Sequence, residues 1–368
     1  MHIAGNTLSG ILGSALILAT LSDVFQSVVV PRAVGRYFRL SSYLWRLLWW
    51  LWPQCAWRIF PNDEERRENL LALFAPTALV TLVLMWIALL MLGYGAIFWS
   101  LRTQMAPELH TYWEATYFAG TSILTIGYGD IVAHGGLARF AALCAGASGL
   151  GVFSITTAFL FALFATFQTR EQFVVLLGAR AGSPPSGLGF LASAAHGGID
   201  LGQATTLRDG QRWIAAVMES HLAYPVLAFF RSSHDYESWI GTLGTLLDAS
   251  LLLITTVEDA TGEARITYEL GRHATHDLAS YFFVAQSDPT AGVERHEFDA
   301  ACERLAAVGY RLREREAAWT EFAALRATYA NNLNALARSF NIPPVQWVGD
   351  RSYVPSQHMR TAEQTQIT

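Results

Sequence analysis

Charged residues are scarce in this sequence of 368 residues: they make up 15 % of it, against roughly 25 % in an average soluble domain. Apolar residues make up 52 %. This composition excludes a disordered chain and argues against a single large soluble domain. We therefore expect part of the chain to lie in a solvent other than water.

Cysteine is rare, and basic charge is not in excess. Three scattered cysteines, Cys55, Cys144 and Cys302, are too few for a disulfide framework or a zinc site. The net charge of −5 leaves no basic footprint for nucleic acid. Lysine is absent, since all 25 basic residues are arginine; we give this feature no functional weight.

Three apolar runs, at about 7–30, 70–99 and 137–167, are long enough to cross a bilayer, which takes about 20 residues of helix. The first run lacks the charged leader and the short core with a small-residue cleavage site that mark a signal peptide. We therefore expect it to be retained as a transmembrane helix, domain 1–31. A fourth apolar piece, 112–124, is too short to span.

Arginine is distributed unevenly between the loops. Between the second run and the start of the third there are only Arg102 and, two residues into the third run, Arg139, whereas the loop between the first two runs contains seven arginines. Because positive residues favour the cytoplasmic side, we expect a multi-pass protein of the cell membrane, with its N-terminus outside and its C-terminal half in the cytoplasm. The seven are Arg32, Arg36, Arg39, Arg46, Arg58, Arg66 and Arg67.

The segment 37–60 is dense in tryptophan and arginine, which is typical of a helix lying in the membrane interface. We assign the whole region 32–69 to the cytoplasmic face on this basis. A voltage sensor is the alternative, but its arginines need regular three-residue spacing, and the first arginines here are spaced irregularly. Asp23 lies near the cytoplasmic end of the first run, where we expect its carboxylate to reach interfacial water.

The motif Thr-Ile-Gly-Tyr-Gly-Asp, Thr125 to Asp130, follows the short apolar piece directly. A dehydrated cation needs a cage of oxygen atoms. Consecutive backbone carbonyls supply one only if left- and right-handed conformations alternate, and glycine reaches positive φ without steric cost. Gly127 and Gly129 have the required spacing. Irregular backbone at membrane depth is tolerated where it lines a pore.

Residues 70–168 resemble the potassium-channel pore family of the prokaryotic two-transmembrane, pore-loop type, with one additional N-terminal helix. The resemblance rests on these six consecutive residues and on their place between the short piece and the last apolar run. It implies an outer helix at 70–99, a pore helix at 112–124, a filter at 125–130 and an inner helix at 137–167.

The resemblance assigns ion binding to the filter, through its backbone carbonyls and the Thr125 hydroxyl. The residues concerned are Thr125, Ile126, Gly127, Tyr128 and Gly129. Ile126 replaces the usual valine, a change that should be tolerated.

Three positions of the predicted pore helix bear on this assignment. Tyr117 occupies the pore-helix position from which the hydroxyl would bond Asp130 and support the filter. Leu124 replaces the usual threonine before the filter, which puts block by quaternary ammonium or barium in doubt but not conduction. Thr121 stands where some members carry a second supporting carboxylate.

The inner helix offers a candidate hinge and a candidate gate. Gly149 lies where the family often has its hinge glycine, although close helix packing through small residues explains it equally well. If the inner helices cross near their cytoplasmic ends, Thr157, Phe161 and Ala165 would line the constriction. One filter copy per chain implies a homotetramer.

The remaining chain predicts a linker at 169–200, a helical cytoplasmic domain at 201–342 and a C-terminal tail at 343–368. Segment 236–257 is apolar enough to resemble a span, but Asp248 at its centre favours a buried helix. The stretch Gly178 to Gly198 is rich in glycine, proline and serine. It lacks the third glycine that a dinucleotide-binding motif requires.

No pattern indicates an enzyme or a cofactor. The cluster Glu269, His273, His276 and Asp277 has helical spacing, for which a solvated surface is the favoured interpretation and a regulatory metal site the alternative. We expect no metal beyond permeant potassium, and no catalytic residues.

The sequence therefore predicts an all-α membrane protein: three transmembrane helices, a re-entrant pore helix and filter, and a helical cytoplasmic domain. The predicted function is passive, potassium-selective conduction by a homotetramer in a lipid bilayer, gated by an unidentified signal or ligand at the cytoplasmic domain. The alternatives are a nonselective cation channel and a non-conducting membrane sensor or scaffold.

Overall fold

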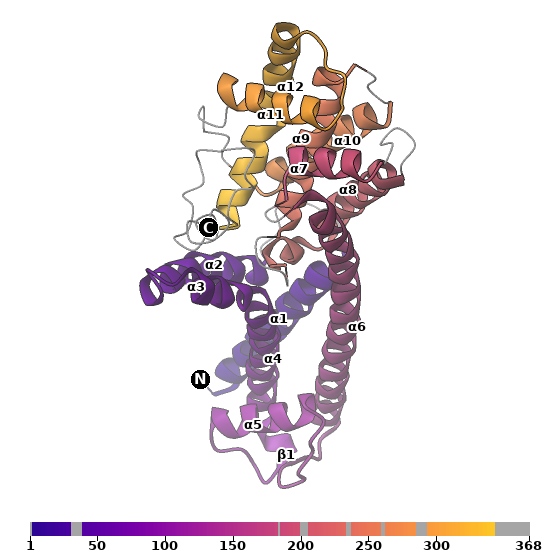
Figure 1. Ribbon diagram of the computed structural model, residues 1–368. Coiled ribbons are helices and arrows are strands. Elements are labelled where there is room, and N and C mark those ends of the chain that lie inside the picture. Colours follow the sequence, from indigo (N-terminus) through magenta and orange to yellow (C-terminus); the bar gives the residue numbers. More distant parts are fainter. Residues whose placement is uncertain are drawn as a thin grey trace. The chain divides into compact units, whose positions relative to one another are not determined.

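The computed structural model describes residues 2–30, 39–182, 185–198, 205–232, 237–258, 262–284 and 293–342. Arg32, Arg36 and the predicted tail at 343–368 lie outside the described residues. The chain is an all-α membrane protein with a helical C-terminal region, as predicted (Figure 1).

Two compact units make up the chain. The first unit comprises Met1–Pro61 and Asn69–Phe164, and the second comprises Asn62–Glu68 and Ala165–Thr368. Among the described residues, the two strands β1 (Met105–Ala106) and β2 (Val132–Ala133) form the only sheet, an antiparallel pair of two residues each.

In the first unit, helix α1 (His2–Val24) packs closely against α4 (Phe74–Ser100). A side-chain carbon built on Gly13 would lie 2.5 Å from the Gly93 carbonyl oxygen, and one on Gly93 would lie 2.7 Å from the Ile17 side chain. Small residues let helix backbones approach this closely in a membrane. The N-terminal apolar run is therefore an integral part of the first unit, and a π-helical turn, Phe25–Val29, extends it.

Helix α2 (Leu40–Ile59) contains the tryptophan-rich segment and leads to α3 (Glu64–Ala72). Trp45, Trp49 and Trp52 surround the Phe74 ring, with centroid distances of 5.6, 4.7 and 5.8 Å. The Trp52 indole also donates a hydrogen bond to the Leu70 carbonyl at 2.9 Å. One face of α2 thus packs on the start of α4, while other apolar side chains, including Leu47, Trp50 and Trp57, stay exposed.

The hairpin that follows α4 contains α5 (Tyr112–Ile123) and leads into α6 (Gly136–Ala181). A short 3-10 turn, Arg102–Gln104, precedes strand β1. The bounds of α5 agree with the predicted pore helix to within one residue. Helix α6 begins where the inner helix was predicted but continues without a break well past residue 167.

The second unit is built around α9 (Trp239–Thr256), whose residues are all buried. Four described helices are long and apolar enough to cross a membrane, and α9 is the fourth of them. The remaining helices of this unit are α7 (Gly187–His196), α8 (Thr205–Ala223), η3 (Pro225–Phe229), α10 (Gly262–Tyr281), α11 (Arg295–Ala307) and α12 (Arg315–Ser339). Because α7, α8, α10 and α12 pack around α9, α9 presents no face to lipid, as expected for a buried helix.

The expectation of a linker at 169–200 is wrong for most of that range. Residues up to Ala181 continue α6, and α7 occupies Gly187–His196 with Leu188 and Leu191 fully buried. The Ser186 hydroxyl caps α7 by accepting a hydrogen bond from the Gly189 amide at 3.0 Å. The small residues that favour a linker here instead permit close packing: a side-chain carbon on Gly187 would lie 2.6 Å from the Ala249 nitrogen.

Candidate ion-conduction site

The end of α5 sets the path of the predicted filter. Thr111 caps the start of this helix by accepting a hydrogen bond from the Glu114 amide. At the other end, the Thr121 carbonyl accepts hydrogen bonds from the amides of Ile126 at 2.8 Å and Gly127 at 3.2 Å. These two bonds turn the chain sharply out of the helix and anchor the first half of the loop to it.

Alternate residues of the loop have positive φ. The values are 56° at Thr125, 57° at Gly127 and 80° at Gly129. A side-chain carbon on either glycine would meet nothing within 4 Å, so conformation, not space, requires glycine there. This alternation is the backbone condition for consecutive carbonyls to point the same way. All residues from Leu124 to Asp130 are exposed in the single chain.

An aromatic pair holds the outer end of the loop. The Tyr117 hydroxyl donates a hydrogen bond to the Asp130 carboxylate at 3.0 Å, the bond that the resemblance implies. The rings of Tyr117 and Tyr128 stack, with centroids 6.4 Å apart and planes 5° from parallel. Thr121 is buried, and its hydroxyl donates to the Phe118 carbonyl, so it offers the loop no side-chain support.

Gly149 lies against the end of the pore helix. A side-chain carbon on it would lie 2.0 Å from the Ile123 carbonyl oxygen, which no movement of a flexible side chain could relieve. Nearby, the hydroxyls of Tyr94 and Ser148 share a hydrogen bond of 2.7 Å that joins α4 to α6. Close packing therefore explains why glycine occupies position 149. Helix α6 is unbroken there, and a hinge at Gly149 stays a prediction.

The candidate gate residues follow one stripe of α6. Thr157 is half-buried, with its hydroxyl donating to the Phe153 carbonyl, whereas Phe161 and Ala165 are exposed. Phe161 is 74 % exposed, as exposed as Leu143 and about as exposed as Phe153 of the same helix. Their exposure in the single chain leaves Phe161 and Ala165 free to face lipid, a neighbouring copy or a pore, and their role at a gate stays a prediction.

Sequence reasoning missed the contacts that position α5 against α4. A side-chain carbon on Gly95 would lie 2.6 Å from the Thr116 hydroxyl oxygen. The Tyr112 hydroxyl donates to the Leu92 carbonyl at 2.7 Å. These partners lie some twenty residues apart, and only the close approach of two helices reveals them.

The expectation that Asp23 reaches interfacial water is wrong. Its side chain is buried, with 2 % of the residue exposed. The carboxylate accepts a hydrogen bond from the Trp86 indole at 2.7 Å, from the Ser41 hydroxyl at 2.9 Å and from the Ser41 amide at 3.2 Å. Because Ser41 lies in the first turn of α2, the carboxylate also caps that helix. Asp23 thus ties together α1, α2 and α4.

The histidine cluster of α10 forms local pairs. His273 lies 3.2 Å from Asp277, and Arg272 lies 2.9 Å from Glu269, both pairs on the solvent-exposed face of α10. The described residues contain no group of three or more histidine, cysteine or acidic side chains that could hold a metal ion. The regulatory metal site therefore has no support from this part of the chain.

Comparison with known proteins found one matching family and one relative. Residues 81–166, from α4 through the loop at 124–130 into α6, match the family described as "Ion channel". The resemblance to pore-loop ion channels is confirmed over these residues. An uncharacterized membrane protein of Bacillus subtilis (strain 168), YdjJ, is 25 % identical over 240 residues, 57 % of this chain and 64 % of the relative. The chain thus spans less than two thirds of that relative. No solved structure matches.

Proposed function

We propose that this multi-pass membrane protein forms a potassium-selective channel. The proposal starts from the match of residues 81–166 to an ion-channel family. The observation that carries the proposal is the filter loop with positive φ at Thr125, Gly127 and Gly129. Carbonyls of this loop and the Thr125 hydroxyl replace the water of a permeant ion, and ions move in single file by mutual repulsion.

Four copies around one axis form the pore. Each chain contributes one filter copy, and a ring of carbonyls around an ion needs several. The exposure of Leu124 to Asp130 in the single chain supports this arrangement, since carbonyls that serve an ion must not be covered by their own chain. Thr157, Phe161 and Ala165 line the constriction on the inner side.

The arginine distribution supports the orientation. The N-terminus lies outside, α2 lies in the inner interface and the second unit is cytoplasmic, where it responds to an unidentified signal.

Conduction performs no covalent chemistry and uses no cofactor. The membrane is the cell membrane.

Tracer flux into liposomes that contain the purified full-length protein tests the proposal. Gly127→Ala places a side chain at φ 57°, which costs about 1–2 kcal/mol and shifts the filter backbone. We expect potassium flux to fall at least tenfold. Gly136→Ala is the matched control, because Gly136 starts α6 and a side-chain carbon there meets nothing within 4 Å.

Three outcomes are informative. Potassium flux lost in Gly127→Ala and kept in Gly136→Ala supports the filter. Equal sodium and potassium flux contradicts selectivity and favours a nonselective channel. Equal potassium flux in both variants contradicts the assignment of the filter to this loop.

A further inference from the structure

One short segment of the second unit contacts two places: the helix that continues the predicted inner helix, and the helix that precedes the predicted outer helix. The segment 225–231 begins with the 3-10 helix η3 and ends at Arg231; we call it the junction. It contacts the C-terminal part of α6, which continues the predicted inner helix, and α3, which leads into α4. Two arginines make these contacts.

Arg170 joins α6 to the junction. Its guanidinium is buried and donates to the Leu227 carbonyl at 2.8 Å and to the Phe230 carbonyl at 2.8 Å. The remaining donors face the Glu171 carboxylate at 2.9 Å. A buried guanidinium is tolerated only when its donors are used in this way. The Phe167 ring contacts both groups: its centroid lies 5.0 Å from the Arg170 guanidinium and 5.4 Å from the centroid of the Phe230 ring.

His221 of α8 completes the surroundings of Arg170. Its Nδ1 lies 2.8 Å from the Val217 carbonyl, so Nδ1 carries the proton, and Nε2 faces the Arg170 guanidinium at 3.4 Å as an acceptor. Burial, and then the charge of Arg170, lowers the pKa of His221 to about 3. The imidazole is therefore neutral and does not repel the arginine.

Arg231 joins the junction to α3 and to the end of α12. Its guanidinium donates to the carbonyls of Phe340 at 3.1 Å and Asn341 at 2.7 Å. The same group forms an ion pair with Glu68 of α3 at 3.3 Å. Glu68 lies six residues before Phe74, the first residue of α4.

We propose that the junction is the mechanical link through which the second unit controls the pore. Arg170 holds the extension of the inner helix, and the pair of Arg231 with Glu68 holds the approach to the outer helix. A shift of α8, α9 or α12 that moves the junction is passed to both helices together. This inference rests on the proposed channel function for its consequence, although the link itself is independent of conduction.

Hydrogen–deuterium exchange on the full-length protein in lipid nanodiscs tests the link. Glu68→Gln removes the ion pair of a half-exposed carboxylate, so the fold is kept. We expect exchange to rise at least fivefold in the α6 amides around Arg170, although the ion pair that is lost lies on α3. Arg170→Lys keeps the charge but loses the planar donor fork, and we expect exchange to rise in α3.

Matched controls use the same helices. Glu65→Gln changes an exposed carboxylate of α3, and Arg180→Lys changes an exposed arginine of α6 that donates to the Thr206 hydroxyl. Both should leave exchange in the other helix unchanged. A rise confined to the mutated helix and the junction would overturn the link.

Potassium flux through the same variants tests the control of the pore. We expect Glu68→Gln and Arg170→Lys to change flux at least threefold, in the same direction, with an unchanged ratio of potassium to sodium flux. Coupled exchange with unchanged flux would overturn the role in controlling the pore. Coupled exchange in a protein that conducts no potassium in any variant would contradict the channel function and leave the link intact.

Discussion

Polar groups are exposed in the predicted filter loop, whereas they are buried and paired in the core of the second unit. The loop from Leu124 to Asp130 is exposed along its length and is anchored to the end of α5 by backbone hydrogen bonds. In the second unit, the buried carboxylate of Asp248 accepts hydrogen bonds from Tyr329 and from Arg326, 3.4 Å away. A conducting site must leave its oxygens available, whereas a stable core must use them. Changes in the two regions should therefore affect different properties.

Loss of Asp248 should have the largest effect on stability. Asp248→Ala deprives Arg326 and Tyr329 of this acceptor, and removal of one partner of a buried ion pair costs about 3–5 kcal/mol. Burial, and then the Asp248 charge, raises the pKa of Tyr329 well above its ordinary value, so its hydroxyl stays a donor. Chemical denaturation of the full chain, followed by circular dichroism, measures the loss.

Asp209→Ala is the control for this change, because Asp209 pairs with Arg212 on an exposed face of α8. It should leave the denaturation midpoint almost unchanged. The ratio of potassium to sodium flux should be the same in folded Asp248→Ala protein as in the wild type. Altered selectivity in that variant would contradict the separation of the two regions.

Loss of one hydrogen bond to the buried Asp23 carboxylate of the first unit should have the next largest effect on stability. Trp86→Phe removes the indole N–H that donates to Asp23, and a hydrogen bond to a charged group contributes about 1.5–3 kcal/mol. Thermal unfolding in detergent measures the loss. Trp113→Phe changes a tryptophan that is 72 % exposed and should have little effect. Equal shifts in both variants would show that the Asp23 hydrogen bond contributes nothing.

The stability of the second unit should depend on pH through His221. Its pKa is about 3 in the folded chain and ordinarily about 6.5. The unfolded chain binds the proton more readily, so stability is complete above about pH 6.5. It falls by about 1.4 kcal/mol per pH unit as the pH drops toward the folded pKa.

Denaturation midpoints between pH 7 and pH 5, compared between wild type and His221→Gln, isolate this contribution. The glutamine should remove the extra slope while still offering an acceptor to Arg170. Parallel slopes in the two proteins would contradict the neutral, buried state of His221.

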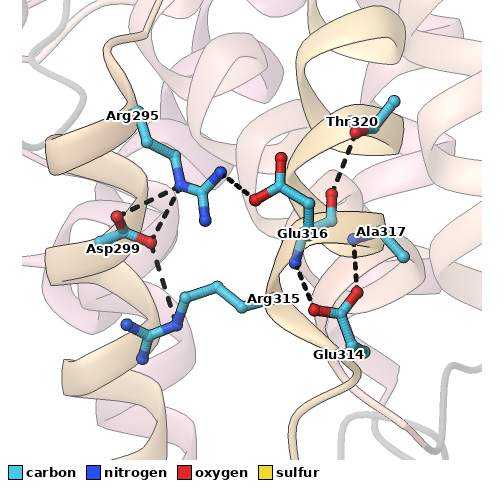
Figure 2. A network of polar contacts seen from close by, with 7 residues as sticks. All are labelled: Arg295, Asp299, Glu314, Arg315, Glu316, Ala317 and Thr320. Atoms are coloured by element: carbon cyan, nitrogen blue, oxygen red, sulfur yellow. Dashed lines mark hydrogen bonds and ion pairs between the residues drawn. The ribbon is translucent and has the colours of Figure 1, made fainter.

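The smallest effect is expected at the surface of the second unit. Figure 2 shows Arg295 of α11 between Asp299, 3.2 Å away, and Glu316 of α12, 2.6 Å away. Solvent and salt screen such pairs. Arg295→Ala should shift the midpoint of thermal unfolding by no more than the error of the measurement at physiological salt. A shift as large as that of Trp86→Phe would show that this network holds α11 to α12.

The same contrast explains what could be predicted from the sequence. Most ends of the three helices in residues 70–168 lie within a few residues of the predicted positions. Long apolar runs and a short local motif determine these helices. The resemblance to the pore family, carried over to the position of Tyr117, implied its hydrogen bond to Asp130. All of this information is local along the chain.

Long-range contacts were not predictable in this way. The partners of Asp23 lie 18 and 63 residues away, and no pattern around Asp23 distinguishes a capped carboxylate from an interfacial one. Helix α7 was missed because its glycines and serines favour a linker unless a partner such as α9 covers them. The junction depends on contacts between α6, α8, α12 and α3, which only the folded unit brings together.

The most direct test of the central claim is the reversal potential of the purified protein in a planar bilayer, with potassium on one side and sodium on the other. A filter made of the Thr125–Tyr128 carbonyls predicts a reversal potential displaced strongly in the direction of preferred potassium permeation, and loss of this displacement in Gly127→Ala. A reversal potential near zero in the wild-type protein would contradict potassium selectivity.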